Sequence, residues 1–167
     1  MNGTAPTPAN LEERAIERLR LEPLDERITK WLSVHAVPML RISLGIVFVW
    51  FGGLKLLPGA SPAAGLVGDT LSAMSFGLMP PSVSLPFIGA WEVAIGLGLL
   101  SGKFLRLTLL LLALQMFGTL TPLVLFPDRT FQFAPFVPTL EGQYILKNAV
   151  LVAGAMVVGS TVRHRAG

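Results

Sequence analysis

The sequence lacks cysteine and has only two histidines. The absence of cysteine excludes disulfides, thiolate metal sites, iron–sulfur clusters and a cysteine-based redox relay. His35 and His164 do not by themselves form a haem or zinc site, so no metal site is predicted. Any redox role therefore needs a partner subunit or a diffusible substrate to carry the electrons.

Charge is also scarce. Charged residues make up 14% of the 167 residues and hydrophobic residues 52%, whereas soluble domains carry about 25% charged residues. A water-soluble globule of this composition would expose large apolar patches. The composition thus indicates an integral membrane protein, and the length fits a single domain. The basic residues flank apolar runs and are not clustered among aromatics, so nucleic acid is not a predicted partner.

Four apolar segments dominate the chain. Each is close to the roughly 20 residues that a helix needs to cross a bilayer. The sequence therefore predicts an all-α fold, an integral membrane four-helix bundle over residues 37–163, in contact with the lipid bilayer. The predicted spans cover about 38–57, 83–101, 104–126 and 144–162.

The polar segment 1–36 precedes the bundle and is predicted to be cytoplasmic. Its first ten residues are predicted to be disordered. Pro23 is expected to end a short charged helix over 11–21, and residues 24–37 are expected to form a second helix. We expect this second helix to lie in the membrane interface, with Trp31 at headgroup depth.

The two longer loops also carry patterns. In loop 58–82, Ser61 followed by Pro62 resembles an N-cap with proline at the first helical position, which predicts a short outer-surface helix. Loop 127–143 is rich in phenylalanine and proline, which suits the outer interface or a lid over the bundle.

Lysine and arginine predict the orientation. Most of them precede the first span, lie between the second and third spans, or follow the fourth span. Because cytoplasmic loops carry an excess of these residues, both termini are predicted to be cytoplasmic. In a bacterium this describes a multi-pass protein of the inner (plasma) membrane.

Glu92 is the most informative residue, because it is a charge near the middle of the second span. Such a charge costs roughly 2.5–3.5 kcal/mol on insertion scales and usually faces the bundle interior with a partner. The first span offers Arg41 and Lys55 on one helical stripe with Gly45 and Gly52. Glu92 is thus a candidate catalytic proton relay. The alternative is a Glu92–Lys55 salt bridge that only fixes helix register.

Polar stripes on the third and fourth spans contribute Gln115 and Lys147. The simplest assembly turns all four stripes inward around an outward-facing polar pocket. The predicted ligand-binding residues are Lys55, Arg41, Gln115 and Lys147. The plainer alternatives are lysines that anchor span ends, an Arg41 that contacts lipid phosphate, and a Gln115 that only joins helices.

Several segments resemble the DoxX-like membrane proteins. LRISLGIVFVWFGGLKLL is similar to their opening helix, and GAWEVAIGLGLLSGKFLR is similar to their second helix. LEGQYILKNAVLVAGA and SPAAGLV resemble the YkgB-type branch. The resemblance covers about residues 25–162. It implies a four-helix membrane bundle, and Arg41, Lys55, Glu92 and Lys147 match the charged pattern of the family.

The family takes its name from a thiosulfate:quinone oxidoreductase, so the resemblance implies a small subunit or partner of a quinone-linked or redox-stress system. A quinone would then be a substrate held among Lys55, Glu92 and Gln115, with no built-in cofactor and with a partner redox subunit as the electron source. The alternatives are a non-catalytic binding or assembly protein and, ranked last, a small transporter. A small-residue ridge on the second span also leaves a homodimer open.

Overall fold

A computed structural model describes residues 8–162, with side chains from residue 23 onward. The predictions made for residues 1–7 and for His164 lie outside the described residues. The chain divides into two units, Met1–Pro38 and Met39–Gly167. The second unit holds all the elements discussed below, apart from the N-terminal part of the first helix.

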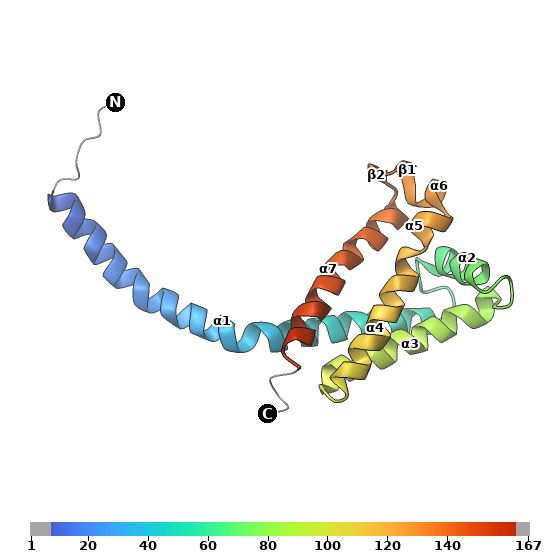
Figure 1. Cartoon of the computed structure of the whole chain (residues 1–167), viewed down its shortest axis with the longest axis horizontal. Helices are drawn as coiled ribbons and strands as arrows, with labels where there is room; N and C mark the ends of the chain where they lie inside the picture. The colour runs from blue at the N-terminus through green and yellow to red at the C-terminus, as the bar shows by residue number, and fades with distance from the viewer. Residues whose placement is uncertain (1–7, 163–167) are drawn as a thin grey trace. The chain divides into compact units, whose positions relative to one another are not determined.

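The fold is almost entirely helical (Figure 1). The elements in chain order are α1 (Pro8–Leu56), α2 (Ala64–Met74), α3 (Pro81–Ser101), α4 (Leu105–Leu120), α5 (Pro122–Leu125), α6 (Pro127–Thr130), β1 (Phe131–Phe133), β2 (Val137–Pro138) and α7 (Leu140–Ser160). Four helical segments are long and apolar enough to cross a membrane. These are Pro23–Leu56, Pro81–Ser101, Leu105–Leu125 and Leu140–Ser160. The predicted all-α membrane bundle is confirmed.

The first helix is longer than predicted. α1 continues through both Pro23 and Pro38, so the prediction that Pro23 ends a helix is wrong. An internal proline removes one backbone hydrogen bond. A helix can nevertheless continue when the surrounding turns keep theirs, and membrane helices tolerate such prolines. The interfacial location of residues 24–37 stays a prediction.

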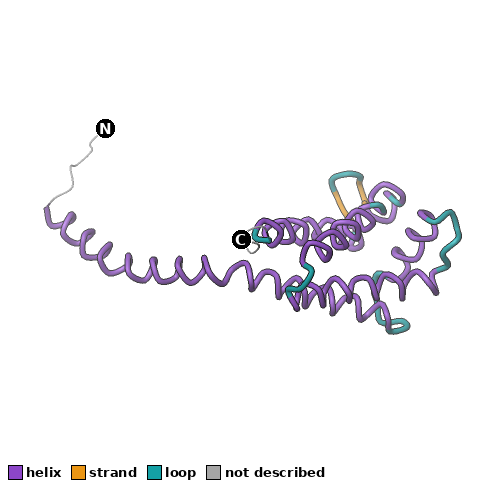
Figure 2. Tube along the Cα trace, turned by 60° about the horizontal axis from the view of Figure 1, so that its bottom comes forward, coloured by secondary structure: helices purple, strands orange, loops and turns teal. Residues whose placement is uncertain are grey.

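The surface helix predicted in loop 58–82 is present as α2. It begins after Ser61, whose carbonyl oxygen accepts the N–H of Ala64 at 3.3 Å. The expected side-chain cap is therefore absent, and the residue in the cap position is Ala63. Loop 127–143 contains a small antiparallel β-hairpin of β1 and β2, drawn in orange in Figure 2. No sequence pattern indicated these strands.

Two ends of the bundle can be distinguished in Figure 1. α2, α5, α6 and the hairpin gather at one end, which we call the hairpin end. The short connection between α3 and α4 lies at the other end, which we call the turn end. Pro122 interrupts the helix at the hairpin end, where α4 stops at Leu120 and α5 starts on Pro122.

Glycines bring α1 and α3 into backbone contact. A Cβ built on Gly96 would lie 2.8 Å from the Gly45 carbonyl oxygen, and one built on Gly89 would lie 2.8 Å from the Gly52 carbonyl oxygen. These pairs run in opposite directions along the two helices, so α1 and α3 are antiparallel. Lys55 is level with Gly89, which is within about one helical turn of Glu92.

The remaining helices pack around a small apolar core. Ile95, Leu99, Leu112 and Val158 from α3, α4 and α7 are fully or almost fully buried. Gly98, from the small-residue ridge, packs against Thr108 of α4, so the ridge is used inside the chain at this point. A homodimer stays a prediction.

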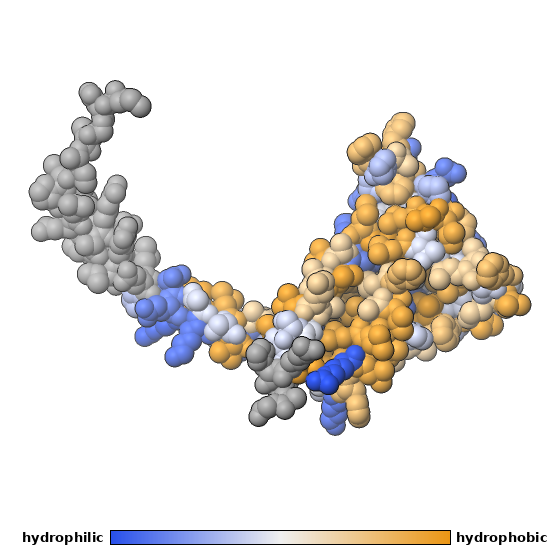
Figure 3. Space-filling view, in the orientation of Figure 1, coloured by the Kyte–Doolittle hydropathy of each residue, from blue (hydrophilic) through white to orange (hydrophobic). Residues whose placement is uncertain are grey.

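The surface outside this core is strongly apolar. Figure 3 shows hydrophobic residues over much of the visible face of residues 39–162. At most 28% of each candidate span is buried within the chain. Bilayer contact accounts for such a surface, because lipid replaces water around it.

Candidate functional site

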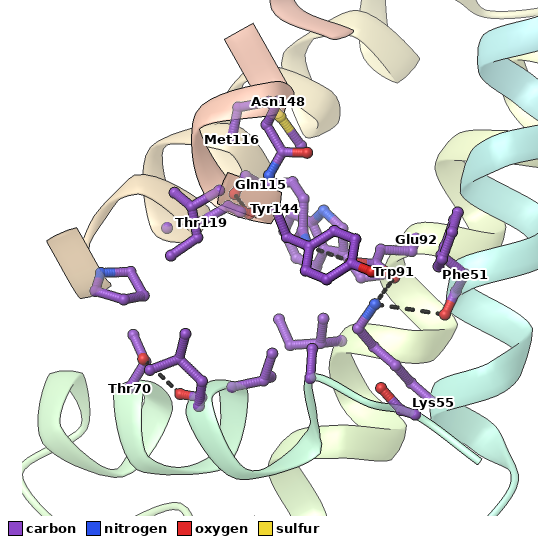
Figure 4. Close-up of a pocket in the computed structure, with 18 of the residues that line it drawn as sticks. Phe51, Lys55, Thr70, Trp91, Glu92, Gln115, Met116, Thr119, Tyr144 and Asn148 are labelled. Atoms are coloured by element: carbon purple, nitrogen blue, oxygen red, sulfur yellow. Dashed lines mark hydrogen bonds and ion pairs between the residues drawn. The ribbon is translucent and has the colours of Figure 1, made fainter. Parts of the chain in front are cut away.

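The second unit contains a cavity of about 790 Å³ in the half of the bundle nearer the hairpin end. Its walls come from α1, α2, α3, α4 and α7, and Figure 4 shows side chains from these helices facing the open space. Most of the lining is apolar, including Phe48, Leu66, Phe87, Trp91, Met116 and Leu151. Its size and lining are typical of small-molecule sites between bundle helices.

A largely buried ion pair forms part of the cavity wall. Lys55 Nζ of α1 lies 2.6 Å from Glu92 Oε2 of α3, and these side chains are 10% and 12% exposed. Lys55 Nζ also donates a hydrogen bond to the Phe51 carbonyl oxygen at 3.4 Å. The predicted pairing of Lys55 with Glu92 is therefore confirmed.

Gln115 of α4 completes this polar group. Its Nε2 donates a hydrogen bond to Glu92 Oε1 at 2.9 Å. Both carboxylate oxygens of Glu92 are thus engaged, one by α1 and the other by α4. We refer to Lys55, Glu92 and Gln115 as the Glu92 triad. All three of its members line the cavity, as Figure 4 shows.

The α7 wall contributes Tyr144, Lys147 and Asn148. Lys147 Nζ lies 5.6 Å from the centre of the Tyr144 ring, in cation–π range. Lys147 therefore lines the predicted pocket but is not part of the Glu92 triad. Sequence reasoning overlooked Tyr144, although its position three residues before Lys147 places both on one helical face.

Arg41 is not among the residues that line the cavity. Its Nη1 donates a hydrogen bond to the Leu99 carbonyl oxygen at 2.8 Å, near the C-terminal end of α3. The last carbonyl groups of a helix lack helical partners and carry partial negative charge, so a guanidinium group stabilises them. Arg41 thus lies apart from the other three predicted ligand-binding residues, and its role in ligand binding stays a prediction.

A second charged cluster joins α2, α6 and α7 at the hairpin end. Arg129 Nη1 lies 2.5 Å from Asp69 Oδ2 of α2, and its Nη2 lies 3.2 Å from Glu141 Oε1 of α7. The hydrogen bond to Asp69 raises the pKa of Arg129 above its usual value. We call these three residues the Arg129 clamp. Its members lie far apart in the sequence, so no local pattern could have revealed it.

The backbone of Arg129 is held by Thr139, which caps α7. Thr139 Oγ1 donates to the Arg129 carbonyl oxygen at 2.6 Å and accepts the N–H of Gly142 at 3.1 Å. α2 supplies Leu66, Thr70 and Met74 to the cavity wall. The clamp therefore fixes a helix that covers one side of the cavity.

The described side chains contain no group of three or more histidine, aspartate or glutamate residues that could hold a metal ion. The polar chemistry available in the cavity is thus that of ammonium, carboxylate, amide and hydroxyl groups in largely apolar surroundings.

The comparison with protein families agrees with this arrangement. The DoxX family model matches residues 36–126, more than half of the chain. The chain belongs to the DoxX family. The matched region of this DoxX protein contains the whole Glu92 triad and Arg41, whereas α7 lies beyond it. No curated protein and no solved structure matches the chain.

Proposed function

We propose that this DoxX protein is a membrane subunit of a quinone-linked redox system and that its cavity binds the quinone. The observation that carries the proposal is an apolar cavity of about 790 Å³ with the Glu92 triad in its wall. A quinone is flat, uncharged and largely apolar, with oxygen atoms that accept hydrogen bonds. The opposite charges of Lys55 and Glu92 offset each other, which suits an uncharged ligand.

The proposed roles follow from the contacts. The apolar walls hold the ring and tail, and a Lys55 N–H donates a hydrogen bond to a quinone oxygen. Reduction of a quinone to a quinol takes two electrons and two protons. The chain has no cysteine, and we assign the electrons to a donor on a partner redox subunit. Glu92, in contact with Lys55, is the candidate relay for the protons.

Trp91 offers a direct test, because it lines the cavity and quinones quench tryptophan fluorescence. The chain has three tryptophans, so the Trp31→Phe/Trp50→Phe variant leaves Trp91 alone. We expect saturable quenching when a short-chain ubiquinone analogue is titrated into this variant in lipid nanodiscs. Adding Thr119→Phe, which fills part of the cavity, should weaken binding at least tenfold.

The matched control is Val124→Phe, because Val124 is 81% exposed and does not line the cavity. This variant should bind like the parent. Non-saturable quenching, equal in both phenylalanine variants, would contradict the proposal. With a partner subunit present, Glu92→Gln should lower quinone-dependent electron transfer without a matching loss of quinone binding.

A non-catalytic binding role is the second candidate, and the almost wholly apolar lining favours it. The same cavity would then hold a lipid-like molecule without turnover. Two observations together would support this role. A ligand should raise the melting temperature of the protein in nanodiscs, and bound quinone should exchange no electrons in the presence of candidate partner subunits.

We also propose that the protein lies in the inner membrane with both termini cytoplasmic, which the distribution of lysine and arginine supports. A chain without cysteine suits single-cysteine labelling. A membrane-impermeant maleimide added to spheroplasts should label Phe136→Cys in the hairpin. It should label Lys103→Cys at the turn end only after permeabilisation, and the reverse pattern would contradict this orientation.

Within the family, we propose that the chain belongs to the YkgB-type branch. Gly142, Gln143 and Lys147 in α7 and the segment SPAAGLV at the start of α2 support this assignment. It predicts that a DoxX-family tree built from many sequences will group this chain with YkgB-type proteins. Placement on another branch would contradict it.

A further inference from the structure

We infer that the cavity binds the reduced, hydroxyl-bearing form of its ligand, a quinol, more tightly than the oxidised quinone. This inference rests on the proposed function and concerns the same site. It follows from the hydrogen-bonding groups that the Glu92 triad leaves unused.

The orientation of the Gln115 amide is fixed by its partner. Lys55 Nζ lies 2.6 Å from Glu92 Oε2, and a carboxylate in such an ion pair only accepts hydrogen bonds. The Gln115 atom that lies 2.9 Å from Glu92 Oε1 must then be the donor Nε2. The amide oxygen Oε1 consequently points away from the carboxylate.

This amide oxygen is an available acceptor. No hydrogen-bond donor among the residues described in the structure contacts Gln115 Oε1. In contrast, every side-chain nitrogen or oxygen of these residues that is fully shielded from solvent has a hydrogen-bond partner. Gln115 Oε1 is therefore not fully shielded by protein. Since Gln115 lines the cavity and is itself buried, the cavity is the space onto which this oxygen opens.

Lys55 supplies the complementary group. An ammonium group has three N–H donors, and Lys55 Nζ uses two of them on Glu92 Oε2 and the Phe51 carbonyl oxygen. One N–H remains for a ligand. The triad thus presents one donor and one acceptor, on either side of the Glu92 carboxylate.

A hydroxyl group satisfies both of these groups, whereas a quinone oxygen satisfies only one. The hydroxyl oxygen can accept from Lys55 while its hydrogen is donated to Gln115 Oε1. A quinone oxygen can only accept, so it leaves the amide oxygen covered and without a donor. Because an unsatisfied buried acceptor is costly, we expect the quinol to bind about tenfold to hundredfold more tightly.

Competition in the Trp91-only protein measures this preference. Anaerobically prepared quinol of the same head group is titrated against bound quinone, and recovery of Trp91 fluorescence gives the ratio of dissociation constants. The parent should favour the quinol at least tenfold. Gln115→Met removes the acceptor and should bring the ratio close to one while quinone still binds. Thr121→Val, which lies outside the cavity lining, should keep the parental ratio.

A second measurement needs no substitution in the triad. Each tenfold preference for the quinol raises the midpoint potential of the bound two-electron couple by about 30 mV relative to the same couple in empty nanodiscs. An unchanged or lowered potential overturns the inference, as does equal binding of both forms or a preference retained in Gln115→Met. If neither form binds saturably, the proposed function fails as well, so the two failures are distinguishable.

Discussion

Gly52 of α1 packs directly against Glu92 of α3. A Cβ built on Gly52 would lie 2.8 Å from the Glu92 Cβ and 2.9 Å from the Gly89 carbonyl oxygen. Real Cβ atoms do not approach other atoms this closely, so the two helices could not keep this spacing around a larger residue. The same contact brings Lys55, one turn further along α1, within reach of the Glu92 carboxylate.

The first prediction concerns this close approach. Gly52→Ala should destabilise the protein by about 1–3 kcal/mol, because the added methyl group overpacks the contact between α1 and α3. Reversible unfolding in mixed micelles measures the change. The control is the adjacent Gly53→Ala, since a Cβ on Gly53 meets no atom within 4 Å. Equal effects of the two substitutions would contradict the packing described for α1.

A second prediction concerns the coupling between Lys55 and Glu92. Lys55→Met and Glu92→Met should each destabilise the bundle by about 3–5 kcal/mol, because each leaves the other group buried and uncompensated. The double variant should be more stable than the sum of these losses implies, since neither charge remains. A double-mutant cycle in the same unfolding assay tests this, and simple additivity would rule out a coupled pair.

Arg41 provides a third prediction. Arg41→Met should cost about 1.5–3 kcal/mol, the usual range for a hydrogen bond to a charged group, because the Leu99 carbonyl oxygen loses its donor. In the folded fraction of this variant, the quinone dissociation constant measured by Trp91 quenching should stay within about twofold of the parental value. This change in binding free energy is well under 1.4 kcal/mol. A large loss of affinity with unchanged stability would instead support Arg41 as a ligand-binding residue.

The fourth prediction concerns the Arg129 clamp. Arg129→Met should lower hydrogen-exchange protection in α2, because α2 loses its link to α6 and α7. The pairs are partly exposed, so the change in global stability should be only about 0.2–1 kcal/mol each. Asp128→Asn is the control, as Asp128 forms no ion pair with any described side chain. Unaltered α2 protection in Arg129→Met would show that the clamp does not hold this helix.

The pH dependence of the clamp follows from the raised pKa of Arg129. A group whose folded pKa is raised contributes stability below its unfolded pKa, and loses it only as pH rises through the folded value. The unfolded pKa of an arginine already lies far above neutral pH, so this loss falls in strongly alkaline solution. Protection of α2 should therefore be the same at neutral and mildly alkaline pH, and exchange measured at both, corrected for intrinsic rates, checks this.

Much of the bundle could be predicted from the sequence because lipid imposes simple rules on each span. Long apolar runs set the four helices, and the cost of a charge in the bilayer identified Glu92. The pairing with Lys55 followed from the shared stripe of Gly52 and Lys55. Glycines of α1 and α3 then let the two helices approach closely enough for the two side chains to meet.

The parts that sequence reasoning missed depend on contacts between distant segments. Arg129 meets Asp69 and Glu141 only once α2, α6 and α7 are assembled. Arg41 shares a helical stripe with Lys55, yet it lies at the opposite end of the bundle and contacts Leu99. Local propensity alone predicts a helix end at Pro23, whereas α1 continues through it. A shared stripe shows which way a side chain faces but not which neighbour it meets.

The hollow between α1, α2, α4 and α7 has a practical consequence for handling the protein. A molecule that binds only the folded state stabilises it in proportion to the logarithm of its concentration. Harsh detergents that strip co-purifying lipids would thus leave the bundle at its least stable. Gentle extraction would keep a bound molecule of this kind in place, and mass spectrometry of the intact particle would then measure its mass.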